Sequence, residues 1–199
     1  MIGVYDYTVL ATYLSLAFGV SGILAAMNGS PYSALLCLMV SGLLDAFDGR
    51  IARTKKNRTE QEKRFGIQID SLNDVVCFGV LPGVIGASLG GGEWWLRASV
   101  LFYILAALIR LAYFNVTEEE RQSATNEHRH YYLGVPVTAA SFVMPLFWAL
   151  PLRLGSALAV IYAVGLTLLA FLFIAPLSIP KPGLKGILCM ILLGASELY

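Results

Sequence analysis

Long apolar stretches separated by short polar ones run through most of the chain. Six of them are long enough, or nearly so, for a membrane-spanning helix, which needs about 20 residues. These stretches are Thr8–Met27, Tyr32–Ala52, Ile67–Leu89, Trp95–Val116, Val135–Leu152 and Ser156–Ala175. A further apolar run, Ile187–Ser196, is too short to span alone, so we expect an interfacial helix or a truncated span there. The pattern predicts an all-α polytopic membrane protein with about six transmembrane helices, in one domain over residues 1–199.

The composition supports this class of protein. Of the 199 residues, 57% are hydrophobic and only 14% are charged, whereas a soluble domain carries about 25% charged residues. The net charge of +1 offers no basis for nucleic-acid binding. The opening MIGVYDY has no basic residue ahead of the first apolar stretch, so we expect no cleavable signal peptide.

The basic residues gather on one side of the predicted membrane. In a six-helix arrangement that side carries Arg50, Arg53, Lys55, Lys56, Arg58, Lys63, Arg64, Arg110, Arg121, Arg129, Lys181 and Lys185. The other side carries Arg97 and Arg153. Because cytoplasmic loops are rich in Lys and Arg, both termini and the polar ends of the second and third stretches are expected in the cytoplasm. The sequence therefore predicts a multi-pass protein of the plasma membrane.

Four aspartates interrupt the second and third apolar stretches. Asp45 and Asp48 are three residues apart, and Asp70 and Asp74 are four apart, so each pair shares one helix face. A carboxylate at membrane depth costs about 2.5–3.5 kcal/mol on insertion scales. A lone aspartate near a helix end is most simply a cap or a surface residue, but four in register favour a functional site. The two stretches are expected to be antiparallel neighbours that bring all four carboxylates to one point.

These carboxylates and their neighbours suggest a metal centre that binds phosphate. Carboxylate oxygens suit hard cations such as Mg²⁺, Mn²⁺ or Ca²⁺, and the three cysteines have no zinc-type spacing. Gly49, Ala52 and Gly66 are small residues on the same lining, where they permit close approach of a ligand. Arg53 follows them, and a guanidinium suits phosphate oxygens. Such a set is typical of phosphoryl-type transfer.

The eight residues just named stand at fixed spacings. The pattern Asp45-x2-Asp48-Gly49-x2-Ala52-Arg53, followed by Gly66-x3-Asp70-x3-Asp74, resembles the signature of the CDP-alcohol phosphotransferases. These integral membrane enzymes displace CMP from a CDP-linked lipid or alcohol with another alcohol. The twelve residues 54–65 make a longer spacing than is usual in the family. We therefore expect an enlarged cytoplasmic loop there that leaves the helix register intact.

Three further segments resemble the phosphatidylserine synthases of that family. They are IDSLNDVVCFGVLP (Ile69–Pro82), RLAYFNV (Arg110–Val116) and LGVPVTAA (Leu133–Ala140). This resemblance implies an enzyme that converts CDP-diacylglycerol and L-serine into phosphatidylserine and CMP. It also implies that the enzyme depends on Mg²⁺ or Mn²⁺. It also implies a homodimer in the lipid bilayer.

The resemblance also implies a role for each residue of the pattern. Asp45, Asp48, Asp70 and Asp74 would hold one or two divalent ions that bind the diphosphate. Asp74 would also deprotonate the serine hydroxyl. Gly49 and Arg53 would contact the nucleotide diphosphate, while Ala52 and Gly66 would leave room for cytidine. For the carboxylate of serine, Arg110 is a candidate partner and Asn115 would assist it; an Arg110 that pairs with lipid headgroups or with an aspartate is an equal alternative.

Two other functions stay open at this point. Another enzyme of the same family, making phosphatidylglycerophosphate or phosphatidylinositol phosphate, would use the same eight residues with a different acceptor. An ion transporter built on intramembrane carboxylates is the alternative from another class. It would distribute its acids along a path, with discontinuous helices in paired halves, whereas all four acids here are expected at one depth.

Overall fold

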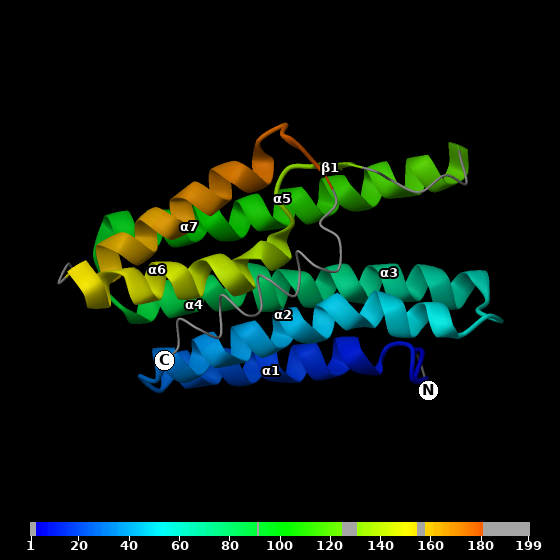
Figure 1. Ribbon diagram of the computed structural model, residues 1–199, viewed down its shortest axis with the longest axis horizontal. Coiled ribbons are helices and arrows are strands. Elements are labelled where there is room, and N and C mark those ends of the chain that lie inside the picture. The colour runs from blue at the N-terminus through cyan, green and yellow to red at the C-terminus, as the bar shows by residue number, and fades with distance from the viewer. Residues whose placement is uncertain (1–2, 91, 125–130, 155–157, 181–199) are drawn as a thin grey trace.

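The chain folds into a bundle of helices that run roughly along one long axis (Figure 1). The computed structural model describes residues 3–90, 92–124, 131–154 and 158–180. Its α-helices are α1 (Leu10–Met27), α2 (Pro31–Thr54), α3 (Glu60–Asp74), α4 (Leu81–Ser88), α5 (Trp94–Ala124), α6 (Ala140–Leu154) and α7 (Leu158–Ile174). A π-helix, η1 (Val75–Val80), joins α3 to α4 as one continuous rod, and a 3₁₀ turn, η2 (Val137–Ala139), leads into α6.

These elements confirm the predicted all-α polytopic membrane fold. The six predicted stretches correspond to α1, α2, the α3–η1–α4 rod, α5, η2 with α6, and α7. Leu10–Met27, Glu60–Ser88 and Trp94–Glu120 are long and apolar enough to cross a membrane, and Val137–Ala149 and Leu158–Ile174 are shorter apolar helices. The predicted C-terminal segment Ile187–Ser196 lies outside the described residues.

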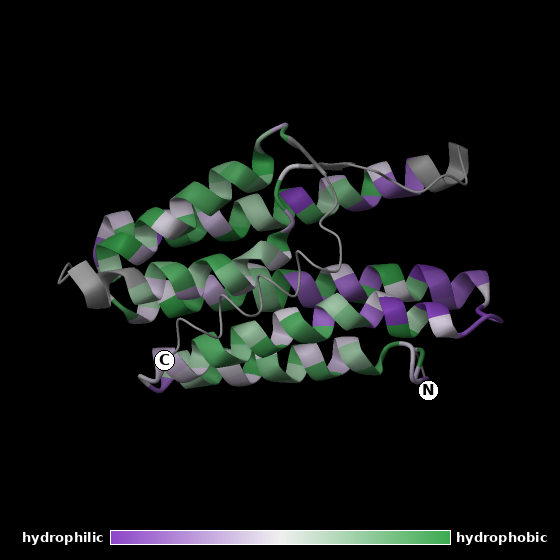
Figure 2. Ribbon diagram, in the orientation of Figure 1, coloured by the Kyte–Doolittle hydropathy of each residue, from purple (hydrophilic) through white to green (hydrophobic). Residues whose placement is uncertain are grey.

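The helices pack around α4, which contacts α1, α2, α5 and α7. Large buried side chains such as Phe78, Leu81, Tyr103 and Leu166 form the core between them. Many apolar side chains point outward instead, as expected for helices that face lipid; Leu101, for example, is 69% exposed. Hydrophilic residues gather at the end of the bundle where α2 is joined to α3 and where α5 ends (Figure 2). Six of the basic residues of the predicted cluster lie at or beside the connection from α2 to α3: Arg53, Lys55, Lys56, Arg58, Lys63 and Arg64. Arg129, Lys181 and Lys185 lie outside the described residues.

The predicted enlarged loop over residues 54–65 is wrong, because helix takes up most of it. α2 continues through Thr54 and α3 begins at Glu60, which leaves only residues 55–59 as the connection. Thr59 caps α3: its hydroxyl accepts a hydrogen bond from the Glu62 amide at 3.2 Å, and the Glu62 carboxylate accepts one from the Thr59 amide at 2.9 Å. Such a reciprocal capping box is a strong start signal for a helix, so the extra residues lengthen α3 by about a turn and a half.

The N-terminal segment is bound to this connection by charge. The Lys55 ammonium lies 2.6 Å from an oxygen of Asp6 and 2.9 Å from an oxygen of Glu62. Asp6 also accepts hydrogen bonds from the amide and hydroxyl of Thr8. The hydrogen bond from Lys55 is the main cause that lowers the pKa of Asp6 to about 2. One ammonium therefore holds both the N-terminal segment and the first turn of α3 in place.

A pair of short strands was not predicted by the apolar pattern. Strand β1 (Tyr131–Leu133) pairs antiparallel with β2 (Ser178–Pro180), with Tyr132 opposite Ile179. Gly134, which follows β1, has a φ of +74°, and a Cβ on it would lie 2.8 Å from the carbonyl oxygen of Phe173. Glycine is therefore required where the chain entering α6 passes closely over the end of α7.

The π-helix after Asp74 arises from Pro82. A proline has no N–H and its ring displaces the carbonyl four residues earlier, which here belongs to Phe78. The backbone widens instead, and the Leu81 amide bonds to the Val76 carbonyl five residues back. The hydroxyl of Tyr103 on α5 donates a 2.6 Å hydrogen bond to the freed Phe78 carbonyl. A side chain of a neighbouring helix thus stabilises the interruption directly below the aspartates.

Replacing Tyr103 with Phe should destabilise the bundle by about 1–3 kcal/mol, the cost of leaving a buried carbonyl without its partner. Thermal unfolding of the purified protein in detergent measures this. Tyr162→Phe is the matched control, because the Tyr162 hydroxyl is also buried but donates to the Pro82 carbonyl over a longer distance of 3.4 Å. Equal losses for the two variants would contradict a special role of Tyr103.

Candidate metal centre

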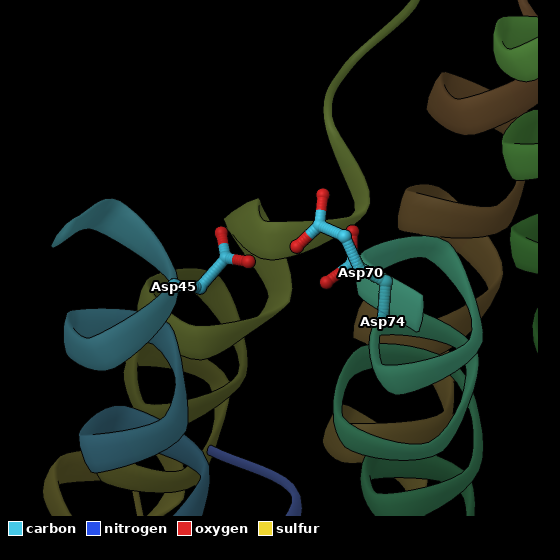
Figure 3. A group of neighbouring side chains, drawn as sticks. All are labelled: Asp45, Asp70 and Asp74. Carbon is cyan, nitrogen blue, oxygen red and sulfur yellow. The ribbon is translucent and has the colours of Figure 1, made fainter. Parts of the chain in front are cut away.

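Three carboxylates meet between the polar halves of α2 and α3. Asp45 projects from α2, and Asp70 and Asp74 project from successive turns of α3 toward it (Figure 3). One oxygen of each residue lies within 4.8 Å of the other two. Asp74 is buried, while Asp45 and Asp70 are partly exposed. The i, i+4 spacing and the antiparallel course of the two helices therefore produce the cluster that the sequence predicted, for three of its four members.

Helix α1 sets the relative height of α2 and α3. It contacts both, whereas α2 packs mainly against α1, α4 and α6 rather than against α3. Ser15 of α1 lies at the centre of a buried polar group: its hydroxyl accepts a 3.3 Å hydrogen bond from the Asn73 amide, and its carbonyl accepts a 2.8 Å bond from the Ser41 hydroxyl. Because Ser41 precedes Asp45 by one turn and Asn73 adjoins Asp74, these bonds bring the carboxylates to one level.

The carboxylates have no basic partner of their own. Among the described residues, none of Asp45, Asp70 and Asp74 lies within 4.0 Å of a lysine or arginine nitrogen. Two unit charges this close repel by about 3 kcal/mol at an effective dielectric constant of about 20. In addition, one oxygen of Asp70 and one of Asp74 are buried without a hydrogen-bond partner in the described chain. Such oxygens fit a hard divalent cation, which supports the predicted metal centre.

Asp48 stands apart from this group. Its carboxylate accepts a 3.4 Å hydrogen bond from the hydroxyl of Thr12 on α1, and it does not belong to the set within 4.8 Å. A direct role of Asp48 as a metal ligand stays a prediction.

The small and basic residues of the pattern lie along the same two helices. Gly49 is exposed, and a Cβ on it would meet nothing within 4 Å. Ala52 is half-buried and Arg53 is exposed on the last turns of α2. Gly66 lies one turn before Asp70 on α3, and a Cβ on it would lie 2.7 Å from the guanidinium of Arg58. The predicted open lining is thus seen at Gly49, whereas Arg58 covers Gly66.

The two residues predicted for the acceptor lie on different sides of α5. Asn115 accepts a 2.9 Å hydrogen bond from the hydroxyl of Ser71, which adjoins Asp70. Arg110 is buried, stands 5.3 Å from the centre of the Phe114 ring, and lines a cavity of about 210 Å³ beside the end of α7. Five residues along a helix turn the side-chain direction by about 140°. The structure therefore joins Asn115 to Ser71, the residue after Asp70, and places Arg110 elsewhere on α5.

Sequence reasoning overlooked three side chains around the cluster. Thr12 binds Asp48, Ser71 binds Asn115, and Arg58 lies against Gly66. Ser71 sits between Asp70 and Asp74 of the pattern. Its place next to Asp70 could have indicated a hydroxyl near the aspartates. Thr12 and Arg58 could not be found in this way. Thr12 reaches Asp48 from another helix and Arg58 reaches Gly66 from a connection, and the spacing of residues along the chain does not determine such packing.

Comparison with known proteins adds a family to this geometry. A family model described as CDP-alcohol phosphatidyltransferase matches residues 8–179. A CDP-diacylglycerol–serine O-phosphatidyltransferase of Mycobacterium tuberculosis is 30% identical over 147 residues, which cover 72% of this chain and 49% of the relative. One of Helicobacter pylori is 34% identical over 145 residues, or 71% of this chain and 56% of the relative. An archaetidylserine synthase of Methanothermobacter thermautotrophicus is 29% identical over 140 residues, or 70% and 56%. The chain thus spans about half the length of these curated relatives.

Proposed function

Since the chain belongs to the CDP-alcohol phosphatidyltransferase family, we propose that it transfers the phosphatidyl group of CDP-diacylglycerol to L-serine and releases CMP. The observation that carries the proposal is the meeting of Asp45, Asp70 and Asp74, all residues of the eight-residue pattern, at one point. The names of the relatives support serine as the acceptor, because bacterial and archaeal relatives alike are named for serine products or substrates.

Asp45, Asp48, Asp70 and Asp74 are proposed to hold a divalent cation, Mg²⁺ or Mn²⁺. When bound, such an ion neutralises charge on the diphosphate and on the departing CMP. One oxygen of Asp70 and one of Asp74 are buried without a hydrogen-bond partner in the described chain, so a cation would stabilise both. The proposed centre lies between the polar halves of α2 and α3.

Asp74 is proposed to be the general base. Its carboxylate takes the proton of the serine hydroxyl while the serine oxygen forms a bond to the β-phosphorus and the bond from that phosphorus to CMP breaks. The position of Asp74 supports this role, since it is the last residue of the pattern and its carboxylate meets those of Asp45 and Asp70. A positioned base contributes about 10²- to 10⁴-fold in rate.

The nucleotide and the acceptor are proposed to lie on different sides of the cluster. Gly49 and Arg53 contact the diphosphate, and Ala52 and Gly66 flank the cytidine. Asn115 reaches the serine substrate from α5, supported by its contact with Ser71 beside Asp70. Arg110 remains a proposed partner of the serine carboxylate only if the acceptor extends toward the cavity beside α7.

We also propose where the enzyme works. The polar end with the carboxylates faces the cytoplasm, because basic residues concentrate there, and the membrane is the plasma membrane. A homodimer is the proposed assembly.

The acceptor is tested with the purified protein in detergent, CDP-diacylglycerol, Mn²⁺ and competing alcohols. We expect CMP release with L-serine and little with glycerol 3-phosphate or inositol phosphate. Release with glycerol phosphate in place of serine would assign another activity of the same family. A protein that releases CMP with neither alcohol, and instead moves cations across vesicle membranes, would support the transporter alternative.

A further inference from the structure

The guanidinium of Arg58 lies on the aspartate-bearing face of α3. A Cβ on Gly66 would stand 2.7 Å from the Nη2 atom of Arg58, and Arg58 donates a 3.1 Å hydrogen bond to the carbonyl of Glu62. Side chains four residues apart on a helix point the same way, so the direction of a Cβ on Gly66 is close to that of Asp70. The Arg58 guanidinium thus lies beside the position of α3 that comes one helical turn, about 5.4 Å along the axis, before Asp70.

The connection that carries Arg58 is firmly held. Lys55, three residues before it, pairs with Asp6 and Glu62, and Thr59, directly after it, caps α3. Both flanking residues are thus bound to the first turn of α3. The connection and the hydrogen bond of Arg58 to the Glu62 carbonyl therefore hold the guanidinium over Gly66, which lowers the conformational entropy lost when a ligand binds.

The charge of Arg58 has no acidic partner among the described residues. The other basic residues of this region are paired or exposed: Lys55 with Asp6 and Glu62, Lys63 with Glu60, and Arg64 with Glu119. The Nε atom of Arg58 is buried and donates no hydrogen bond within the described chain. A buried donor without an acceptor is costly, and the planar fork of a guanidinium matches two phosphate oxygens.

We propose that Arg58 binds the phosphate of the CMP moiety of the nucleotide-lipid, next to the metal centre and on its cytoplasmic side. This inference rests on the proposed function and assigns a specific nucleotide contact to it. Arg58 belongs to the segment 54–65, which is longer than is usual in the family. On this proposal, the longer segment supplies a group that binds the nucleotide and does not only connect α2 to α3. Glycine at position 66 is then required because a larger side chain would push the guanidinium off the face of α3.

Isothermal titration of the purified protein with CDP in the presence of Mg²⁺ tests the proposal. Arg58→Ala should weaken CDP binding by roughly 10- to 100-fold, the range for loss of hydrogen bonds to a charged group. Arg58→Lys should fall between Arg58→Ala and the wild type, since it keeps the charge but loses the fork. Lys56→Ala is the matched control: it removes one positive charge from an exposed position of the same connection and should bind CDP as the wild type does.

The outcomes distinguish the role of Arg58 from the proposed function of the chain. A wild type that binds CDP and turns over, together with an Arg58→Ala variant that binds CDP as Lys56→Ala does, overturns the role of Arg58 and leaves the proposed function standing. A wild type that binds no CDP overturns both. In turnover assays we expect Arg58→Ala to raise KM for CDP-diacylglycerol and leave KM for serine unchanged. Should Arg58→Ala not fold, Arg58→Lys decides, because wild-type affinity in that variant contradicts bidentate phosphate binding.

Discussion

Replacing Asp74 with Asn should abolish measurable CMP release, lowering turnover by about 10²- to 10⁴-fold. An amide has nearly the shape of the carboxylate but cannot accept the proton of the attacking hydroxyl. Asp74 is also a member of the three-carboxylate cluster, so the assay is run at saturating Mn²⁺ to separate the loss of the base from weaker metal binding. CMP release from CDP-diacylglycerol and serine is the measurement.

Binding of the nucleotide serves as the control for this variant. Asp74→Asn should still bind CDP with an affinity near that of the wild type at saturating metal, because the proposed nucleotide contacts lie at Gly49, Ala52, Arg53, Arg58 and Gly66. Full turnover in Asp74→Asn would show that another group takes the proton. Loss of CDP binding together with turnover would indicate that Asp74 acts through the fold instead.

Replacing Asp45 with Asn should weaken the binding of Mn²⁺ by at least about 100-fold, because even the loss of a residue that only supports a ligand costs roughly 10- to 100-fold. Titration of Mn²⁺ followed by electron paramagnetic resonance measures the affinity directly, without turnover. Asp48→Asn should have a smaller effect, since its carboxylate binds Thr12 and lies outside the group within 4.8 Å. The ratio of the two losses distinguishes a three-carboxylate centre from a four-carboxylate one.

Glu93→Gln is the control for general loss of acidic charge, because Glu93 is an exposed acid in the connection before α5, far along the chain from the cluster. It should bind Mn²⁺ as the wild type does. If Asp45→Asn also kept wild-type affinity for Mn²⁺, the cluster would not be the metal centre, and the acids would need another explanation such as proton binding.

The residues that the sequence could predict are those whose positions follow from helical periodicity. Asp70 and Asp74 share a face by their spacing alone, and the polar connection between two apolar stretches makes α2 and α3 antiparallel. The apolar pattern also predicted six helical units, with ends that differ by a few residues. These features depend on local geometry, which the order of residues determines directly.

Features that depend on packing between helices could not be predicted from the sequence. The contact of Tyr103 with the Phe78 carbonyl requires knowing that α5 lies beside η1. The position of Arg58 over Gly66 depends on how five residues of connection fold, and the capping box at Thr59 shortened a loop that charge and polarity alone suggested to be long. Asp48 lies outside the group within 4.8 Å, and its contact with Thr12 of a third helix could not be predicted from its spacing to Asp45.

The π-helix below Asp74 has a consequence for comparing this protein with others. Each residue of an α-helix advances the side-chain direction by about 100°, so the additional residue closed by the Leu81–Val76 bond shifts the phase of everything that follows. The half of the rod before the π-helix can therefore direct its aspartates at α2 while Gly83 and Gly86 face Ile104 of α5 and Leu166 of α7. Deletion of one residue from Val75–Val80 would leave both halves helical but misalign them. In an alignment, a single-residue gap at this place would thus mark a relative in which the two halves of the rod are rotated against each other.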